Sequence, residues 1–131
     1  MPYLRVRVAS TPRRTTAGEI AHLLTRLAVD TLHKSENAVA IDLRFTDPEN
    51  WFVGGKSLSE RQESSFFIEI KLTDGTNSRD EKALFIRQAF KGMAMILGKI
   101  SDTSYIVAHD VSSDSWGYGG KTQEYRYISE S

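Results

Sequence analysis

The sequence predicts a mixed α/β (α+β) fold built from two tandem β-α-β units, and an internal repeat is the main observation behind that prediction. Residues 51–56 (WFVGGK) and 116–121 (WGYGGK) share a tryptophan, a Gly-Gly pair and a lysine, with an offset of 65 residues (116 − 51 = 65). A repeat of this kind indicates two similar structural units in one chain. Before each segment, a run with helical periodicity lies between two runs with period-two alternation, which gives the order strand, helix, strand.

Length and composition limit the protein class. The 131 residues fit one globular domain over residues 1–131, with a first repeat over about 2–58 and a second over about 64–128. The formal net charge is zero, which favours neither nucleic acid nor an anionic membrane as a partner. The absence of cysteine excludes disulfides, thiolate catalysis and Cys-based zinc sites.

Metal, membrane and targeting features are not expected either. The three histidines do not have metal-ligand spacing. No apolar run approaches the roughly 20 residues of a membrane span, and the first residues lack a signal-peptide pattern. We therefore expect a cytoplasmic protein that needs no metal and no organic cofactor.

The first unit begins with a strand over residues 3–8, whose alternate residues are apolar. Thr16 and Glu19 fit a capping box, which satisfies two free amides at the start of a helix. The apolar spacing after Glu19 predicts that this helix continues to about His33. Alternation over residues 38–45 predicts the second strand.

The second unit repeats this order. A strand is predicted over residues 66–72, and Ser78 and Glu81 fit a second capping box. Strands are also predicted over residues 105–111 and, after the Gly-rich segment, over residues 123–128. The buried face of the second helix is predicted from its apolar spacing to contain Ala83, Ile86, Phe90, Met93, Leu97 and Ile100.

Strand–helix–strand order implies a parallel strand pair with a right-handed crossover in each unit. Joined edge to edge through residues 56–65, the units would form a four-stranded mixed sheet with both helices on one face, plus short C-terminal hairpin strands. The other face would carry polar and aromatic side chains, namely Arg5, Arg7, Asp42, Arg44, Tyr105 and His109. A sheet with one uncovered face usually has a partner, so we expect a homo-oligomer.

Pro2 opens a strand, an arginine precedes the first helix, and an aromatic residue is followed by a Gly-Gly hairpin. In these features the chain resembles the tautomerase superfamily, specifically its 4-oxalocrotonate tautomerase branch. It covers nearly the whole chain. Short members of the family are single β-α-β units that form hexamers, and longer members carry two units per chain and form trimers. The resemblance therefore implies a fused form that assembles as a homotrimer.

Pro2 matches the family's catalytic proline, which is exposed once Met1 has been removed. A chain-terminal proline is a secondary amine held rigidly by its ring. An apolar pocket and nearby cations both lower the pKa of an amine, which gives a neutral base near pH 7. Such a base can take a proton from a carbon next to a carbonyl group, whereas with Met1 retained the nitrogen is an unreactive amide.

The resemblance also implies substrate-binding residues. Arg14, or its neighbour Arg13, matches an arginine that binds a substrate carboxylate through the fork of its guanidinium group. Trp116 matches a wall residue that keeps the pocket dry. The chain has Ala40 and Tyr105 where relatives have a second arginine, so Tyr105, His109 or Arg44 would have to replace it.

The predicted function is a tautomerase or isomerase that acts on a small enol or 2-oxo carboxylic acid of the 2-hydroxydienoate type, with Pro2 as general base and acid. Two alternatives remain open. A cofactor-independent hydratase, dehalogenase or decarboxylase of the same superfamily would need a carboxylate close to Pro2, for which Asp42 and Glu124 are the candidates. A non-catalytic homo-oligomeric binding protein would be favoured by retention of Met1.

Overall fold

The computed structural model describes residues 1–11 and 13–130, without the side chain of Glu130; Pro12 and Ser131 lie outside the described residues. Its first unit consists of β1 (Tyr3–Ala9), α1 (Thr16–Leu32) and β2 (Ala40–Thr46). Its second unit consists of β5 (Ser65–Thr73), α3 (Arg79–Leu97) and β6 (Tyr105–Val111).

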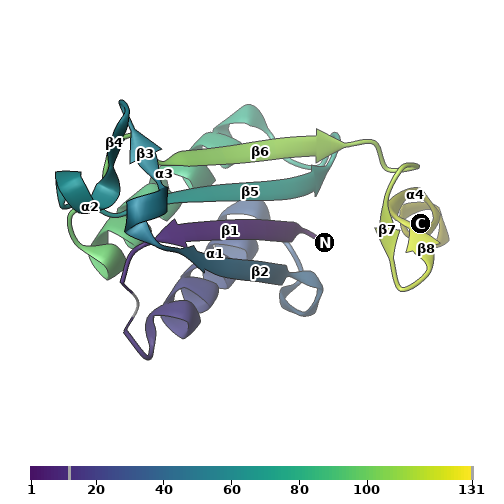
Figure 1. Cartoon of the computed structure of the whole chain (residues 1–131). Helices are drawn as coiled ribbons and strands as arrows, with labels where there is room; N and C mark the ends of the chain where they lie inside the picture. The colour runs from purple at the N-terminus through teal and green to yellow at the C-terminus, as the bar shows by residue number, and fades with distance from the viewer. Residues whose placement is uncertain (12, 131) are drawn as a thin grey trace.

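The six elements form one four-stranded mixed sheet in the order β2-β1-β5-β6. Pairing is parallel within each unit, β1 with β2 and β5 with β6, and antiparallel between the units along β1 and β5. Figure 1 shows both long helices, α1 and α3, behind this sheet, while the face toward the viewer carries no helix of comparable length. The predicted fold is confirmed.

The core lies between the sheet and the two helices. The inward residues of β1 and β5 alternate with outward ones, as predicted, because successive side chains of a strand point to opposite faces. Leu4 and Val6 on β1 and Ile68 and Ile70 on β5 are completely buried. Opposite them, the helices contribute further buried residues, namely Ile20, Leu24, Ala28, Phe85, Ala89 and Met93.

The buried face of α3 agrees with the prediction only in part: of the predicted residues, Met93 is buried, and Phe90, Leu97 and Ile100 pack partly buried against the core. Phe85, Ala89 and Met93, spaced four residues apart, face the core, whereas Ala83 and Ile86 are exposed. The register is set by helix–helix contact, because Gly92 meets α1 so closely that a Cβ there would lie 2.6 Å from the methyl carbons of Leu23. Ile100 lies beyond the end of α3.

One of the two predicted capping boxes is present. The Ser78 hydroxyl accepts from the amide of Glu81 at 3.1 Å, and the Glu81 carboxylate accepts from the amide of Ser78 at 2.8 Å. The box predicted at Thr16 and Glu19 is wrong. The N-cap of α1 is Thr15, the Thr16 hydroxyl accepts from the amide of Arg13 at 2.9 Å, and Glu19 pairs with the Arg13 side chain.

Each unit ends in a small hairpin followed by a short helix. In the first unit these are β3 (Phe52–Val53), β4 (Lys56–Ser57) and α2 (Leu58–Arg61), and in the second β7 (Gly117–Tyr118), β8 (Lys121–Thr122) and α4 (Gln123–Glu130). Both Gly-Gly pairs have positive φ angles at both residues, which a two-residue hairpin turn requires. Short 3₁₀ helices occupy Glu36–Ala38 and Pro48–Asn50.

The terminal strand predicted over residues 123–128 is wrong, because this segment forms α4. The Thr122 hydroxyl accepts from the amide of Tyr125 at 3.0 Å, as an N-cap residue does. The repeat explains the helix: Gln123 follows Leu58 by the same 65 residues (123 − 58 = 65), and both residues begin a helix after a hairpin. Within the described residues, no helix is long and apolar enough to cross a membrane.

Candidate active site

Pro2 lies at the start of β1 and is buried. Its carbonyl accepts a hydrogen bond from the amide of Ala40 at 3.1 Å, which anchors it to the start of β2. Beside it is a cavity of about 430 Å³. The side chains around this cavity are mostly apolar or aromatic, and the residues that line it are Met1, Pro2, Tyr3, Asn37, Ala38, Val39, Ala40, Lys71, Trp116, Gly117 and Tyr118.

Trp116 forms part of the same wall, although it is separated from Pro2 by most of the sequence. It follows β6 and immediately precedes β7, and its indole nitrogen donates to the Thr73 hydroxyl at 3.2 Å. That bond fixes the indole ring to the end of β5, the strand antiparallel to β1. Pro2 and Trp116 thus line one cavity, and the roles that the resemblance implies for them stay predictions.

The electrostatic environment of the N-terminus disfavours a positive charge. Burial lowers the pKa of the Met1 ammonium group, and the positive charges of Lys34 and Arg126 lower it further. With Met1 present, this amine stands in for the amine that Pro2 would carry after Met1 removal, displaced by one residue. A neutral amine is favoured on both grounds, because burial and like charges each disfavour the charged form.

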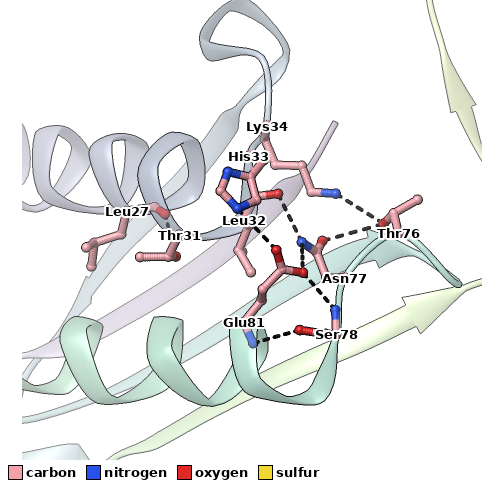
Figure 2. Close-up of polar contacts among 9 residues, drawn as sticks. All are labelled: Leu27, Thr31, Leu32, His33, Lys34, Thr76, Asn77, Ser78 and Glu81. Carbon is pink, nitrogen blue, oxygen red and sulfur yellow. Dashed lines mark hydrogen bonds and ion pairs between the residues drawn. The ribbon is translucent and has the colours of Figure 1, made fainter.

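Lys34 is held near the N-terminus by the junction of the two units (Figure 2). It follows the left-handed C-cap His33 of α1, and its ammonium group donates to the Thr76 hydroxyl at 3.1 Å. Below it, the Asn77 amide donates to the Leu32 carbonyl at 3.0 Å and to the Glu81 carboxylate at 3.3 Å. The α1 C-terminus is thus tied to the α3 N-terminus.

Arg13 and Arg14 are not brought to this cavity. They precede α1 on the segment that follows β1, so they lie at the opposite end of the strand from Pro2. Arg13 is exposed and its guanidinium group pairs with Glu19 at 3.0 Å. Within one chain, neither arginine lines the cavity beside Pro2. Their role in carboxylate binding stays a prediction, and it would require a second copy of the chain.

Tyr105 and His109 occupy the outer strand β6. Tyr105 pairs with Phe67, which pairs with Arg7, so it lies near the end of the sheet that is remote from Pro2. His109 pairs with Lys71, which pairs with Tyr3, so it lies at the Pro2 end but two strands away. Both are exposed, and neither lines the cavity.

Three cations near Pro2 were missed by the sequence reasoning. Lys71 lines the cavity itself, whereas Lys34 and Arg126 act on the N-terminal amine. The position of Lys71 near Pro2 would follow from antiparallel pairing of β1 with β5, because that pairing places the end of β5 beside the start of β1. Arg126 could not be placed while its segment was taken for a strand.

The second unit has no equivalent proline. In the first unit Tyr3 pairs with Ala40, the first residue of β2, and in the second unit Phe67 pairs with Tyr105, the first residue of β6. Phe66 is therefore the counterpart of Pro2 in the strand register. Its nitrogen is a peptide amide inside the chain, so it offers no amine. In the described residues, the site exists once per chain.

The comparisons with known proteins agree with this architecture. A model of the tautomerase enzyme family matches residues 67–125. A fused 4-OT solved as an asymmetric trimer (R7) is 22% identical, with 95% of this chain and 98% of that chain covered and a TM-score of 0.83. A second fused 4-OT trimer (F6) is 20% identical, with the same coverage and a TM-score of 0.82.

A macrophage migration inhibitory factor-like protein from Entamoeba histolytica is also similar in fold. It is 19% identical, with 92% of this chain and 97% of that chain covered, and its TM-score is 0.76. No curated protein sequence matches the chain. The resemblance to the tautomerase superfamily that the sequence predicted is confirmed, and the match lies in the second unit, outside Pro2.

Proposed function

We propose that this chain, which has the fold of fused 4-OT and a tautomerase family match in its second unit, is a cofactor-independent tautomerase of a small enol or 2-oxo carboxylic acid. Pro2, freed by removal of Met1, would be its general base and acid. The observation that supports this most directly is the shared cavity of Pro2 and Trp116, at a terminus where burial, Lys34 and Arg126 lower the pKa of the Met1 amine.

The reaction needs only a proton transfer in each direction. The neutral Pro2 nitrogen takes a proton from the enol oxygen or from the carbon next to the carbonyl group. The electron pair released spreads over the enolate or dienolate, and the protonated Pro2 then returns a proton to a different atom of the substrate. No electrons are lost or gained overall, and Trp116 would exclude water that could solvate and stabilise the ammonium form.

The mature N-terminus provides the test. Purified protein is first characterised by mass spectrometry, and ketonisation of phenylenolpyruvate is then followed by ultraviolet absorbance. Processed protein should accelerate ketonisation, whereas protein that retains Met1 should be inactive because an amide nitrogen cannot accept the proton. Pro2→Ala leaves a more mobile primary amine and should reduce activity without abolishing it. Equal turnover by the processed and Met1-retaining forms would require another base.

A homotrimer is part of the proposal. The solved fused 4-OT relatives are trimers, and the open sheet face of this chain carries exposed arginine side chains. Arg5, Arg7 and Arg44 line a hollow on this face with a single carboxylate, Asp42. In such an assembly, another copy could present Arg14 or Arg13 to the cavity beside Pro2.

A hydratase or dehalogenase is the second candidate, and the position of Glu124 favours it. Asp42 is already occupied, since it accepts from the Tyr3 hydroxyl at 2.9 Å and lies 3.9 Å from Arg44. Glu124 instead lines a cavity that Met1 also lines, where its carboxylate could activate a water molecule. A Glu124→Gln variant distinguishes the two reactions: it should abolish hydration of an acetylenic or halogenated acid and leave ketonisation unchanged.

A further inference from the structure

A second, larger cavity adjoins the one beside Pro2. Its volume is about 620 Å³, and Met1, Ala38 and Tyr118 line both cavities. Its far wall is formed by α4, which contributes Gln123, Glu124, Arg126, Tyr127 and Ile128. Figure 1 shows why: α4 and the β7–β8 hairpin lie beyond the end of the sheet at which β1 starts. A ligand that reached Pro2 could therefore extend toward α4.

Arg126 is the cation on this wall, and the hairpin holds it in place. Its guanidinium group donates to the Tyr118 carbonyl at 2.8 Å and lies 3.9 Å from the centroid of the Tyr118 ring. Gly119 makes room for it, because a Cβ at that position would lie 2.7 Å from a guanidinium nitrogen. Stacking on an aromatic ring fixes the plane of a guanidinium group and leaves its edge available for an acceptor.

Much of the hydrogen-bonding capacity of Arg126 is unused within the described part of the chain. A guanidinium group has five N–H donors. The Nε donor is buried and has no partner, and no described carboxylate lies within ion-pair distance of the group. Because Nε is buried, a ligand in the cavity would use N–H donors of the terminal guanidinium nitrogens other than the one bonded to the Tyr118 carbonyl.

The charges around the cavity restrict where an anion could bind. Asp74 and Glu124 also line the cavity and would repel a carboxylate from their part of it. Lys34 donates to Thr76, another lining residue, and both Lys34 and Arg126 act electrostatically on the N-terminal amine. The positive part of the cavity is therefore the part next to the N-terminus, where the reacting atoms of a substrate would lie.

We propose that Arg126 is a substrate-binding residue that holds the carboxylate of the enol or 2-oxo acid through its guanidinium edge. This inference rests on the proposed function, and it assigns the carboxylate to a group from the same chain as Pro2. Arg13 and Arg14 cannot take this role within one chain, because they lie at the other end of β1. A carboxylate bound by Arg126 would extend toward Pro2 through the region that both cavities share.

The test is direct binding, so that it does not depend on turnover. Met1-free protein is titrated by calorimetry with 3-phenylpropionate and, as a neutral probe of the same shape, with 3-phenylpropionamide. The variants are Arg126→Gln, Arg126→Lys and the control Arg87→Gln, which removes an exposed arginine from α3. Loss of a charge-assisted hydrogen bond should weaken carboxylate binding by about tenfold or more in Arg126→Gln.

The expected pattern is specific to charge. Arg126→Gln should weaken binding of 3-phenylpropionate and leave binding of the amide unchanged, Arg126→Lys should recover part of the loss, and Arg87→Gln should match wild type. Equal weakening of both probes would overturn the proposal, since it would indicate a disturbed Tyr118 contact. Unchanged carboxylate binding in Arg126→Gln would also overturn the proposal. The same holds if the wild-type protein does not bind 3-phenylpropionate more tightly than 3-phenylpropionamide. Arg126-dependent binding without any ketonisation would refute the proposed reaction and keep the carboxylate site.

Discussion

Asn77 connects the two units of the chain, and replacing it should measure how firmly they are joined. Its amide group donates to the Leu32 carbonyl at the end of α1 and to the Glu81 carboxylate at the start of α3. Asn77→Ala removes both bonds, together with a long 3.5 Å bond that Asn77 accepts from the Thr76 hydroxyl, and leaves the Ser78–Glu81 capping box in place. The substitution therefore isolates the contact between the units from the start of the helix itself (Figure 2).

The expected loss follows from the geometry of the two bonds. The bond to Leu32 is a neutral, partly buried bond of 3.0 Å, and a bond of this type contributes about 1 kcal/mol. The bond to Glu81 is longer, at 3.3 Å, and its carboxylate is partly solvent-accessible, so we assign it the low end of the range. The free energy of unfolding should fall by about 1–2 kcal/mol, or roughly 3–7 °C in Tm for a chain of this size.

Urea unfolding followed by far-UV circular dichroism measures this loss, with all variants at one protein concentration because assembly is linked to stability. Asn50→Ala, in the exposed 3₁₀ helix Pro48–Asn50, is the matched control and should be close to wild type. Asn77→Asp should be less stable than Asn77→Ala at neutral pH, because its carboxylate would face the acceptors of Asn77. That difference should shrink as the pH falls below about 4, where aspartate is protonated. A loss below about 0.3 kcal/mol in Asn77→Ala would refute the reasoning, because it is less than a single hydrogen bond of this kind contributes.

Three further predictions concern the site and the assembly. Trp116→Ala should admit water, which stabilises the ammonium form of Pro2 and raises its pKa. The acidic limb of the pH–rate profile should therefore move to higher pH, and an unmoved limb would show that Trp116 does not keep the pocket dry. Lys34→Gln should move the same limb in the same direction, because a neighbouring positive charge that disfavours the ammonium form is lost. Light scattering at micromolar concentration should give three chains per particle, and a monomer would exclude the proposed trimer.

The fold was predictable because the patterns that define its strands are local in the sequence, and because the Gly-Gly segment occurs twice. Alternation defined β1, β2, β5 and β6, and the WFVGGK and WGYGGK segments showed that one unit follows another. The face of α3 was not predictable from periodicity, since apolar residues such as Ile86 and Phe85 are adjacent and only contact with α1 decides between them. Gly92 was the available indication, because a glycine inside a helix often marks a close approach.

Only some residues of the candidate site were predicted, because placing the others near Pro2 requires the order and direction of the strands. Trp116 and Pro2 followed from the resemblance, and the cavity they share is present. Placing Lys34 and Lys71 near Pro2 needed one further inference, from the directions of the strands in the sheet. Parallel pairing of β1 with β2 and antiparallel pairing of β1 with β5 place the start of β1, the start of β2 and the end of β5 at one end of the sheet.

The same topology determines which arginines of a single chain lie at the Pro2 end of the sheet. A segment that leaves the end of β1 is separated from Pro2 by the length of that strand, which applies to Arg13 and Arg14. Segments that follow β5 or β6 begin at the Pro2 end of the sheet, because both strands end there. Arg126 lies on the segment that follows β6, so the topology places this arginine, unlike Arg13 and Arg14, at the Pro2 end of the sheet. Recognising it required a helix at residues 123–130, and the only indication in the sequence was the 65-residue offset from Leu58.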